Sequence, residues 1–114
     1  MSRVTDIVPS RLKRHLVHLC VRLDVLIERR TEGTLHPQLG KRALRALLVD
    51  MEQARERHER LYGKGVDAHR VRLVTDEIAA HIEMALETRD RDDFLAALDD
   101  ARTWARQWLV KIGG

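Results

Sequence analysis

Apolar residues recur every three or four positions along most of the chain. The clearest run is a leucine seam near the N-terminus, with spacings of 4, 3, 4 and 3 residues, formed by Leu12, Leu16, Leu19, Leu23 and Leu26. This period places the leucines on one side of an α-helix, as in helices that pack against other helices. None of the later segments reads as a strand, since none alternates apolar and polar residues with a period of two.

Three polar or glycine-containing breaks, at residues 31–37, 63–65 and 89–93, interrupt this period. The segments between them predict four helices, over about residues 10–30, 38–62, 67–88 and 92–112. The residues expected to begin or end helices are Pro9 and Ser10, Asp67, Asp90 or Asp92, and Gly63.

Four amphipathic segments of similar length with short connections predict an all-α fold. The simplest arrangement is an antiparallel up-down-up-down four-helix bundle, in one domain spanning residues 1–114. The length of 114 residues argues against a two-domain enzyme. An aromatic content of 4% and only two prolines argue against a β-sandwich or barrel.

The chain has a single cysteine, Cys20, which excludes an intrachain disulfide and a zinc site built on cysteines. The N-terminal residues lack the apolar core of a signal peptide, and no run of about 18 apolar residues occurs. We therefore expect a cytoplasmic protein that neither spans a membrane nor is exported.

Positive charge is concentrated in the first part of the chain. Residues 1–65 carry 14 Lys and Arg against 8 Asp and Glu, a net of +6, whereas residues 66–114 carry 7 against 10, a net of −3. On a helical wheel several cations of the first helix, together with His15 and His18, share one arc beside the leucine seam.

This arc and the start of the second helix could follow a nucleic-acid backbone with low sequence specificity. The candidate nucleic-acid-binding residues are Arg11, Arg14, Arg22, Arg29, Lys41, Arg42 and Arg45. The alternative is an ordinary solvated helix face. No helix-turn-helix, zinc finger or aromatic RNA-binding motif accompanies these residues.

Metal and catalytic sites find little support in the sequence. His58 and His81 project near apolar seams, but Glu-x-x-His, His-Glu-x-x-His and intrahelical His-x-x-x-His pairs are absent, so we expect structural histidines and no metal or cofactor. The Arg11 to His18 spacing resembles that of helical RNases, a spacing that also arises by chance in an arginine-rich chain. We expect no enzymatic activity.

Two side chains are candidates for an oligomer interface. Arg55 falls within the apolar arc of the second helix, where an unpaired charge is costly. Its stem could pack while its head reaches water, or it could pair with a neighbouring helix or a second subunit. Trp104 lies at the edge of a broad apolar face on the last helix, while Trp108 belongs more clearly to the core.

Two segments resemble a known family. Residues 39–48, Leu-Gly-Lys-Arg-Ala-Leu-Arg-Ala-Leu-Leu, resemble the start of the second helix in four-helix-bundle proteins that include the accessory variability determinant (Avd) of diversity-generating retroelements. Residues 94–111 are similar to that family's last helix, which closes with a tryptophan and a basic residue, although Arg106 and Gln107 replace its small-residue pair. The resemblance implies a non-catalytic, basic homo-oligomer, a pentamer in that family, which binds a reverse transcriptase and its template RNA.

The expected function is therefore that of a non-enzymatic accessory protein that binds nucleic acid and a reverse transcriptase. Two alternatives remain open. One is a protein-interaction or scaffold bundle with no nucleic-acid role, and the other is a small metal-binding or RNase-type helical enzyme.

Overall fold

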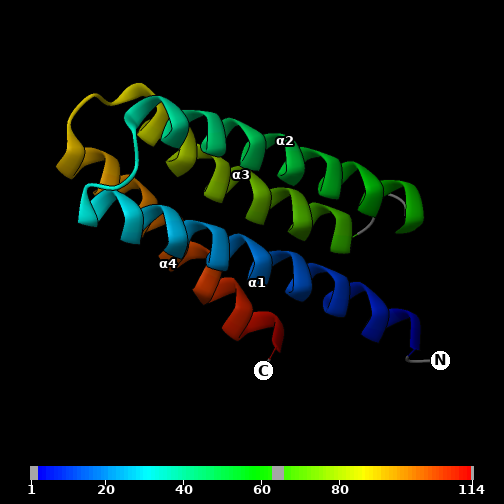
Figure 1. The fold of residues 1–114 in the computed structure, drawn as a ribbon. Coiled ribbons are helices and arrows are strands. Elements are labelled where there is room, and N and C mark those ends of the chain that lie inside the picture. Colours follow the sequence, from blue (N-terminus) through cyan, green and yellow to red (C-terminus); the bar gives the residue numbers. More distant parts are fainter. Residues whose placement is uncertain (1–2, 63–65, 114) are drawn as a thin grey trace.

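The chain folds into four α-helices (Figure 1), as the computed structural model shows. It describes residues 3–62 and 66–113, with side chains described for residues 13–60 and 69–111. The helices are α1 (Arg3–Glu32), α2 (Pro37–Tyr62), α3 (Val66–Glu87) and α4 (Arg91–Gly113). No strand occurs in these two described ranges, so the predicted all-α four-helix class is confirmed.

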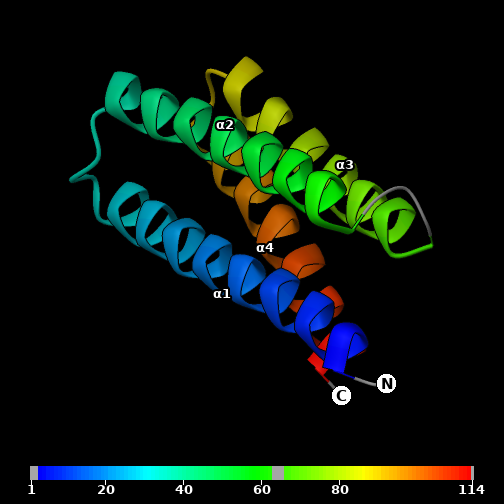
Figure 2. The same ribbon diagram turned by 90° about the vertical axis from the view of Figure 1, so that its right-hand side faces the viewer.

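The helices lie lengthwise in an elongated body with extents of 50 × 24 × 17 Å. Helix α4 packs closely on both α1 and α3, and α2 packs on α3, whereas α1 meets α2 over a smaller area. Turning the view shows α1 and α2 diverging from each other (Figure 2). The connections α1–α2 and α3–α4 lie together at the end of the molecule opposite the chain termini.

The first helix is longer than predicted. It begins at Arg3, so the expected start at Pro9 and Ser10 is wrong and both residues lie inside α1. Proline has no amide hydrogen and removes one bond from the helical ladder, which the remaining bonds of a 30-residue helix can tolerate. The other three helices begin and end within one residue of their expected bounds.

The helix ends show which capping predictions hold. The Asp90 carboxylate accepts the Asp93 amide hydrogen at 3.1 Å, so Asp90 caps α4 as predicted and Asp92 lies in its first turn. The predicted cap Asp67 is wrong, because α3 already begins at Val66 and Asp67 falls within the helix. The predicted end at Gly63 lies outside the described residues.

The core follows the helical period of the sequence. Of the leucine seam, the residues whose side chains are described are all buried, and Leu12 lies outside that range. The core residues with no exposed surface include Leu23, Leu44, Ile78, Ile82 and Leu98. Leu35, from the α1–α2 connection, is also buried and closes the core at the loop end.

No described helix is both long enough and apolar enough to cross a membrane.

Candidate nucleic-acid interface

Basic side chains gather where the α1–α2 and α3–α4 connections meet. They come from the last turn of α1, the first three turns of α2, and the connection leading into α4. We call this set the loop-end cluster: Arg29, Arg30, Lys41, Arg42, Arg45, Arg89 and Arg91. The set brings together residues up to 62 positions apart in the chain, from Arg29 to Arg91.

A pocket of about 150 Å³ lies within the loop-end cluster. Its apolar lining is formed by Leu35, Pro37, Gly40 and Phe94, and its charged lining by three cations and one carboxylate: Arg30, Lys41, Arg89 and Asp90. The Arg30 guanidinium lies 5.9 Å from the centre of the Phe94 ring, a cation–π contact that keeps the charge beside the apolar surface. The pocket therefore combines an apolar surface with cations from three elements.

Local backbone geometry fixes this end of the bundle. Gly33 has a φ of 77°. The Gly33 amide donates to the Arg30 carbonyl at 3.2 Å and the Thr34 amide donates to the Arg29 carbonyl at 2.9 Å, which is the Schellman pattern of a helix C-terminus. Helix α2 then begins with Pro37 in its first position, and the His36 Nδ1 accepts the Gln38 amide hydrogen at 3.1 Å.

Arg91 ties the start of α4 to the end of α1. Its guanidinium donates to the carbonyl oxygens of Thr31 at 2.7 Å and Arg30 at 3.4 Å. A cation at the C-terminus of a helix satisfies carbonyls that have no partner within the helix and interacts favourably with the helix dipole. The two connections are thereby held next to each other.

The cluster's cations are not neutralised by direct ion pairs. Among the described side chains, no member of the loop-end cluster lies within 4 Å of a carboxylate. The same end of the bundle also carries exposed carboxylates, so the positive field is local and does not extend over the whole end. These carboxylates belong to Glu32, Glu87, Asp90, Asp92 and Asp93. Arg91 is occupied by backbone carbonyls, whereas the other cations of the cluster can contact an anion of the solvent or of a partner.

The structure divides the predicted nucleic-acid-binding residues into two groups. Arg29, Lys41, Arg42 and Arg45 belong to the loop-end cluster. Arg14 is exposed on the N-terminal half of α1, away from that cluster, and the Arg11 side chain lies outside the described range.

Arg22 is occupied by a contact within the chain. Its guanidinium pairs with Asp50 of α2 at 2.6 Å. Near it, burial is the main cause that lowers the pKa of His15, followed by the charge of Arg22. Lys41, by contrast, faces the α3–α4 connection. The structure therefore does not join the α1 arc and the start of α2 into one continuous track.

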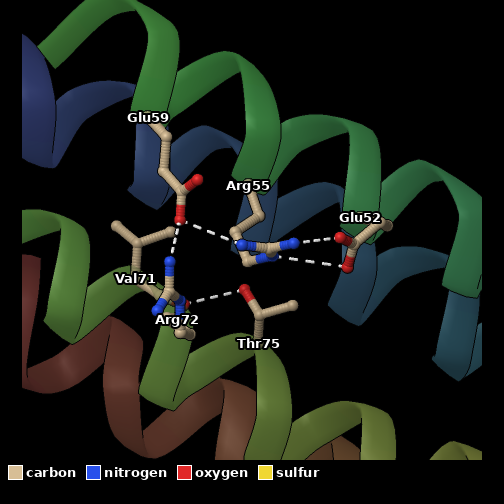
Figure 3. Close-up of polar contacts among 6 residues, drawn as sticks. All are labelled: Glu52, Arg55, Glu59, Val71, Arg72 and Thr75. Carbon is tan, nitrogen blue, oxygen red and sulfur yellow. Dashed lines mark hydrogen bonds and ion pairs between the residues drawn. The ribbon is translucent and has the colours of Figure 1, made fainter. Parts of the chain in front are cut away.

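Arg55 is satisfied inside the chain (Figure 3). Its side chain is only 18% exposed, and its guanidinium pairs with Glu52 and, at 2.9 Å, with Glu59. Glu59 also accepts a hydrogen bond of 2.6 Å from Arg72 of α3. This bond is the largest cause that lowers the pKa of the Glu59 carboxyl, which burial opposes. The arginine thus joins a network that links α2 to α3, and its predicted role in an oligomer interface stays a prediction.

Trp104 and Trp108 are both half-buried on α4. The Trp104 ring stacks on His81, with centroids 6.5 Å apart and planes inclined by 22°. The Trp108 indole N–H donates to Glu77 of α3 at 3.2 Å, and the Lys111 ammonium lies 4.8 Å from the centre of the Trp108 ring. Contacts within one chain therefore account for the positions of both indole rings. The predicted role of Trp104 in an oligomer interface also stays a prediction.

The single cysteine and one histidine are buried in the described part of the chain. His58 is buried, and no group of three His, Cys, Asp or Glu side chains with metal-binding geometry occurs among the described residues. Burial is the main cause that raises the pKa of the Cys20 thiol, which keeps it protonated.

Comparisons of the chain with protein-family models, with curated proteins and with solved structures found no match.

Proposed function

We propose that the protein is a non-enzymatic accessory factor that binds the phosphate backbone of nucleic acid through the loop-end cluster. The observation that supports this function best is the grouping of basic side chains at one end of the bundle, none of which forms an ion pair with a described carboxylate. Three of these cations line the apolar pocket, where Asp90 is the one acidic residue in the described lining. Guanidinium and ammonium groups in such a cluster contact phosphate oxygens and release condensed counterions, which favours binding without base recognition.

The bundle topology belongs to the same proposal. We infer an antiparallel up-down-up-down arrangement, supported by the α1–α2 and α3–α4 connections, which lie together at one end of the body, and by the packing of α4 on both α1 and α3. This topology places the α1–α2 and α3–α4 connections at one end, which is the condition for forming the cluster from both of them.

Salt dependence gives the first quantitative test. If the cluster neutralises about six phosphates of a single strand, affinity should fall roughly 300-fold between 50 and 200 mM salt. We would measure fluorescence anisotropy of a labelled single-stranded RNA of mixed sequence across this range. Affinity that does not change with salt would contradict the proposal.

Charge reversal locates the binding surface. The test variant is Arg29→Glu/Arg42→Glu/Arg45→Glu, whose three side chains are exposed and form no ion pair with a described carboxylate. The matched control is Arg57→Glu/Arg60→Glu/Arg70→Glu, three exposed arginines near the other end of α2 and α3.

We expect the test variant to lose at least tenfold in affinity and to flatten the salt dependence, because each lost phosphate contact with a single strand reduces the slope by about 0.7. The control should retain most of its affinity. Circular dichroism checks that both variants keep their helicity. Equal losses in the two variants would show that binding is a general effect of net charge, with no role for the cluster.

The reverse transcriptase is the proposed protein partner, and this part rests on the resemblance to Avd. We expect purified protein to retain a reverse transcriptase of a diversity-generating retroelement in a pull-down, together with its template RNA. The enzyme should be retained equally by the control variant above. A reverse transcriptase that elutes unbound would leave RNA binding alone as the function.

A protein-interaction bundle without a nucleic-acid role is the second candidate. Exposed apolar side chains on several helices favour it, including Val17, Val49, Met84 and Val110. This candidate predicts no retention on RNA at 50 mM salt.

A further inference from the structure

The outer face of α1 carries an apolar stripe that stays exposed beside the described parts of the chain. Val17, Val21 and Val25 follow one another at four-residue spacing and are 43%, 55% and 45% exposed. At about 100° per residue they fall on one side of the helix, away from the buried leucines. Three β-branched side chains in register on a solvent-facing helix leave a continuous apolar surface exposed to water.

The charges that flank this stripe are symmetric about its centre. Arg14 lies seven residues before Val21, and Glu28 lies seven residues after it. Both are exposed, and neither forms an ion pair among the described side chains. With the valines they occupy an arc of about 80° on the helix surface, at about 100° per residue.

Direction matters for this surface. Reversing the direction of the helix exchanges the positions of Arg14 and Glu28 and leaves the valines in place. A surface with this property is complementary to a second copy of itself, which is the requirement for a contact with two-fold symmetry. Asp24, at the edge of the stripe, is occupied by Arg102 at 2.9 Å and by Arg106 at 3.4 Å and takes no part in this contact.

We propose that two copies of this chain associate through α1, antiparallel, with the two-fold axis beside Val21. Val17 then faces Val25 of the second copy, Val21 faces its own equivalent, and Arg14 pairs with Glu28 of the second copy at both ends of the contact. The distance from Arg14 to Glu28 along the axis is about 21 Å at 1.5 Å per residue, so both ion pairs fit within one straight helix pair.

This inference goes beyond the proposed function and does not depend on it. The stripe contains no member of the loop-end cluster, and the antiparallel pairing places the two clusters at opposite ends of the dimer. Arg14 is assigned to the dimer contact and not to phosphate binding.

The predicted contact is a weak one. A single pair of helices buries less than the roughly 1,200 Å² of a standard stable interface, so the dimer is expected to dissociate on dilution.

The contact also has a definite stoichiometry. A two-fold contact closes with two copies, whereas a five-membered ring needs a head-to-tail contact between different surfaces. Sedimentation equilibrium over a wide range of concentrations should therefore show monomer and dimer. A monomer at every concentration, or a pentamer, would overturn the proposal.

Charge exchange tests the antiparallel register. Arg14→Glu alone and Glu28→Arg alone each replace two attractive pairs by two repulsive ones, and each should weaken the dimer roughly tenfold, which corresponds to about 1.4 kcal/mol. The double variant Arg14→Glu/Glu28→Arg restores opposite charges and should recover the wild-type dissociation constant. Mixing the two single variants should also restore association, because each heterodimer contains two opposite-charge pairs.

Two further variants complete the experiment. Val21→Glu places two carboxylates beside the axis and should abolish the dimer, with circular dichroism as the check on folding. Glu83→Arg, an exposed charge reversal on α3, is the matched control and should leave the dimer unchanged. Single charge reversals without effect, or a double variant as weak as the single ones, would refute the proposed register.

Discussion

Gly33 should be sensitive to substitution for a conformational reason alone. Its φ of 77° lies in the left-handed region, and an added Cβ would meet no heavy atom within 4 Å. Gly33→Ala therefore creates no clash, and its whole cost is the left-handed conformation of a residue with a side chain. That cost is about 1–2 kcal/mol. Gly33→Asn should lose less, because asparagine tolerates this conformation better.

Gly40 provides the contrasting case on the same side of the bundle. It lies inside α2, where alanine is intrinsically better than glycine by about 1 kcal/mol. A Cβ at this position would approach the Leu35 Cδ2 to 3.0 Å, so the buried Leu35 side chain must shift. Gly40→Ala should thus gain little or lose stability in the wild type and gain about 1 kcal/mol in a Leu35→Ala background, where the obstruction is gone.

Urea unfolding followed by circular dichroism at 222 nm measures all of these variants, with the slope of the transition checked for constancy. For Gly33→Ala a loss of about 1 kcal/mol corresponds to a fall of roughly 4–8 °C in Tm for a domain of about this size. If Gly33→Ala were as stable as the wild type, α1 would not end in a left-handed residue and the Schellman assignment would be wrong. If Gly40→Ala had the same effect in both backgrounds, Leu35 would not be the limiting contact.

Two histidines give further predictions. His36→Ala removes the acceptor of the Gln38 amide hydrogen and should lower the free energy of unfolding by about 1 kcal/mol, whereas His36→Asn should stay within a few tenths of the wild type in the same urea assay. For His15, the folded-state pKa lies below the ordinary histidine value of 6.5, mainly through burial, so the unfolded state binds more protons on acidification. Stability should therefore fall as the pH drops below about 6.5, and His15→Gln should reduce this dependence in urea titrations between pH 5 and 8. An unchanged slope in that variant would contradict the assignment.

The helices and the core were predictable because the helical period is a local property. Residues such as Leu16, Leu19 and Leu23 were identified by spacing alone, and all three are buried. The start of α1 was predicted wrongly. A proline was read as the helix boundary, although a long helix can accommodate one missing hydrogen bond.

The candidate site was predictable only in part. Arg29, Lys41, Arg42 and Arg45 were chosen from the sequence for their place on a predicted basic face. Arg30, Arg89 and Arg91 were missed, because their proximity depends on which connections meet at one end of the bundle. The useful signal was the position of basic residues beside two predicted loops, which the net negative charge of residues 66–114 obscured.

The partners of Arg55 could have been read from the sequence. Glu52 and Glu59 stand three residues before it and four after it, the spacings at which side chains meet on a helix. The pairing of Arg22 with Asp50 could not be predicted from the sequence, because these residues are separated by 28 positions and meet only through the packing of α1 beside α2.

The polar contacts between helices explain why a count of charges does not locate the binding surface. Each pair of neighbouring helices has a polar contact at its edge. These contacts are Arg22–Asp50 (α1–α2), Arg72–Glu59 (α2–α3), Trp108–Glu77 (α3–α4) and Arg102–Asp24 (α4–α1). Exposed pairs of this kind contribute little stability, about 0–1 kcal/mol, but opposite charges favour one neighbour over another. Arginines used in this way are not available to an external anion. The basic residues of the loop-end cluster lie outside these contacts, and for that reason they, rather than the basic half of the sequence as a whole, are the candidates for phosphate binding.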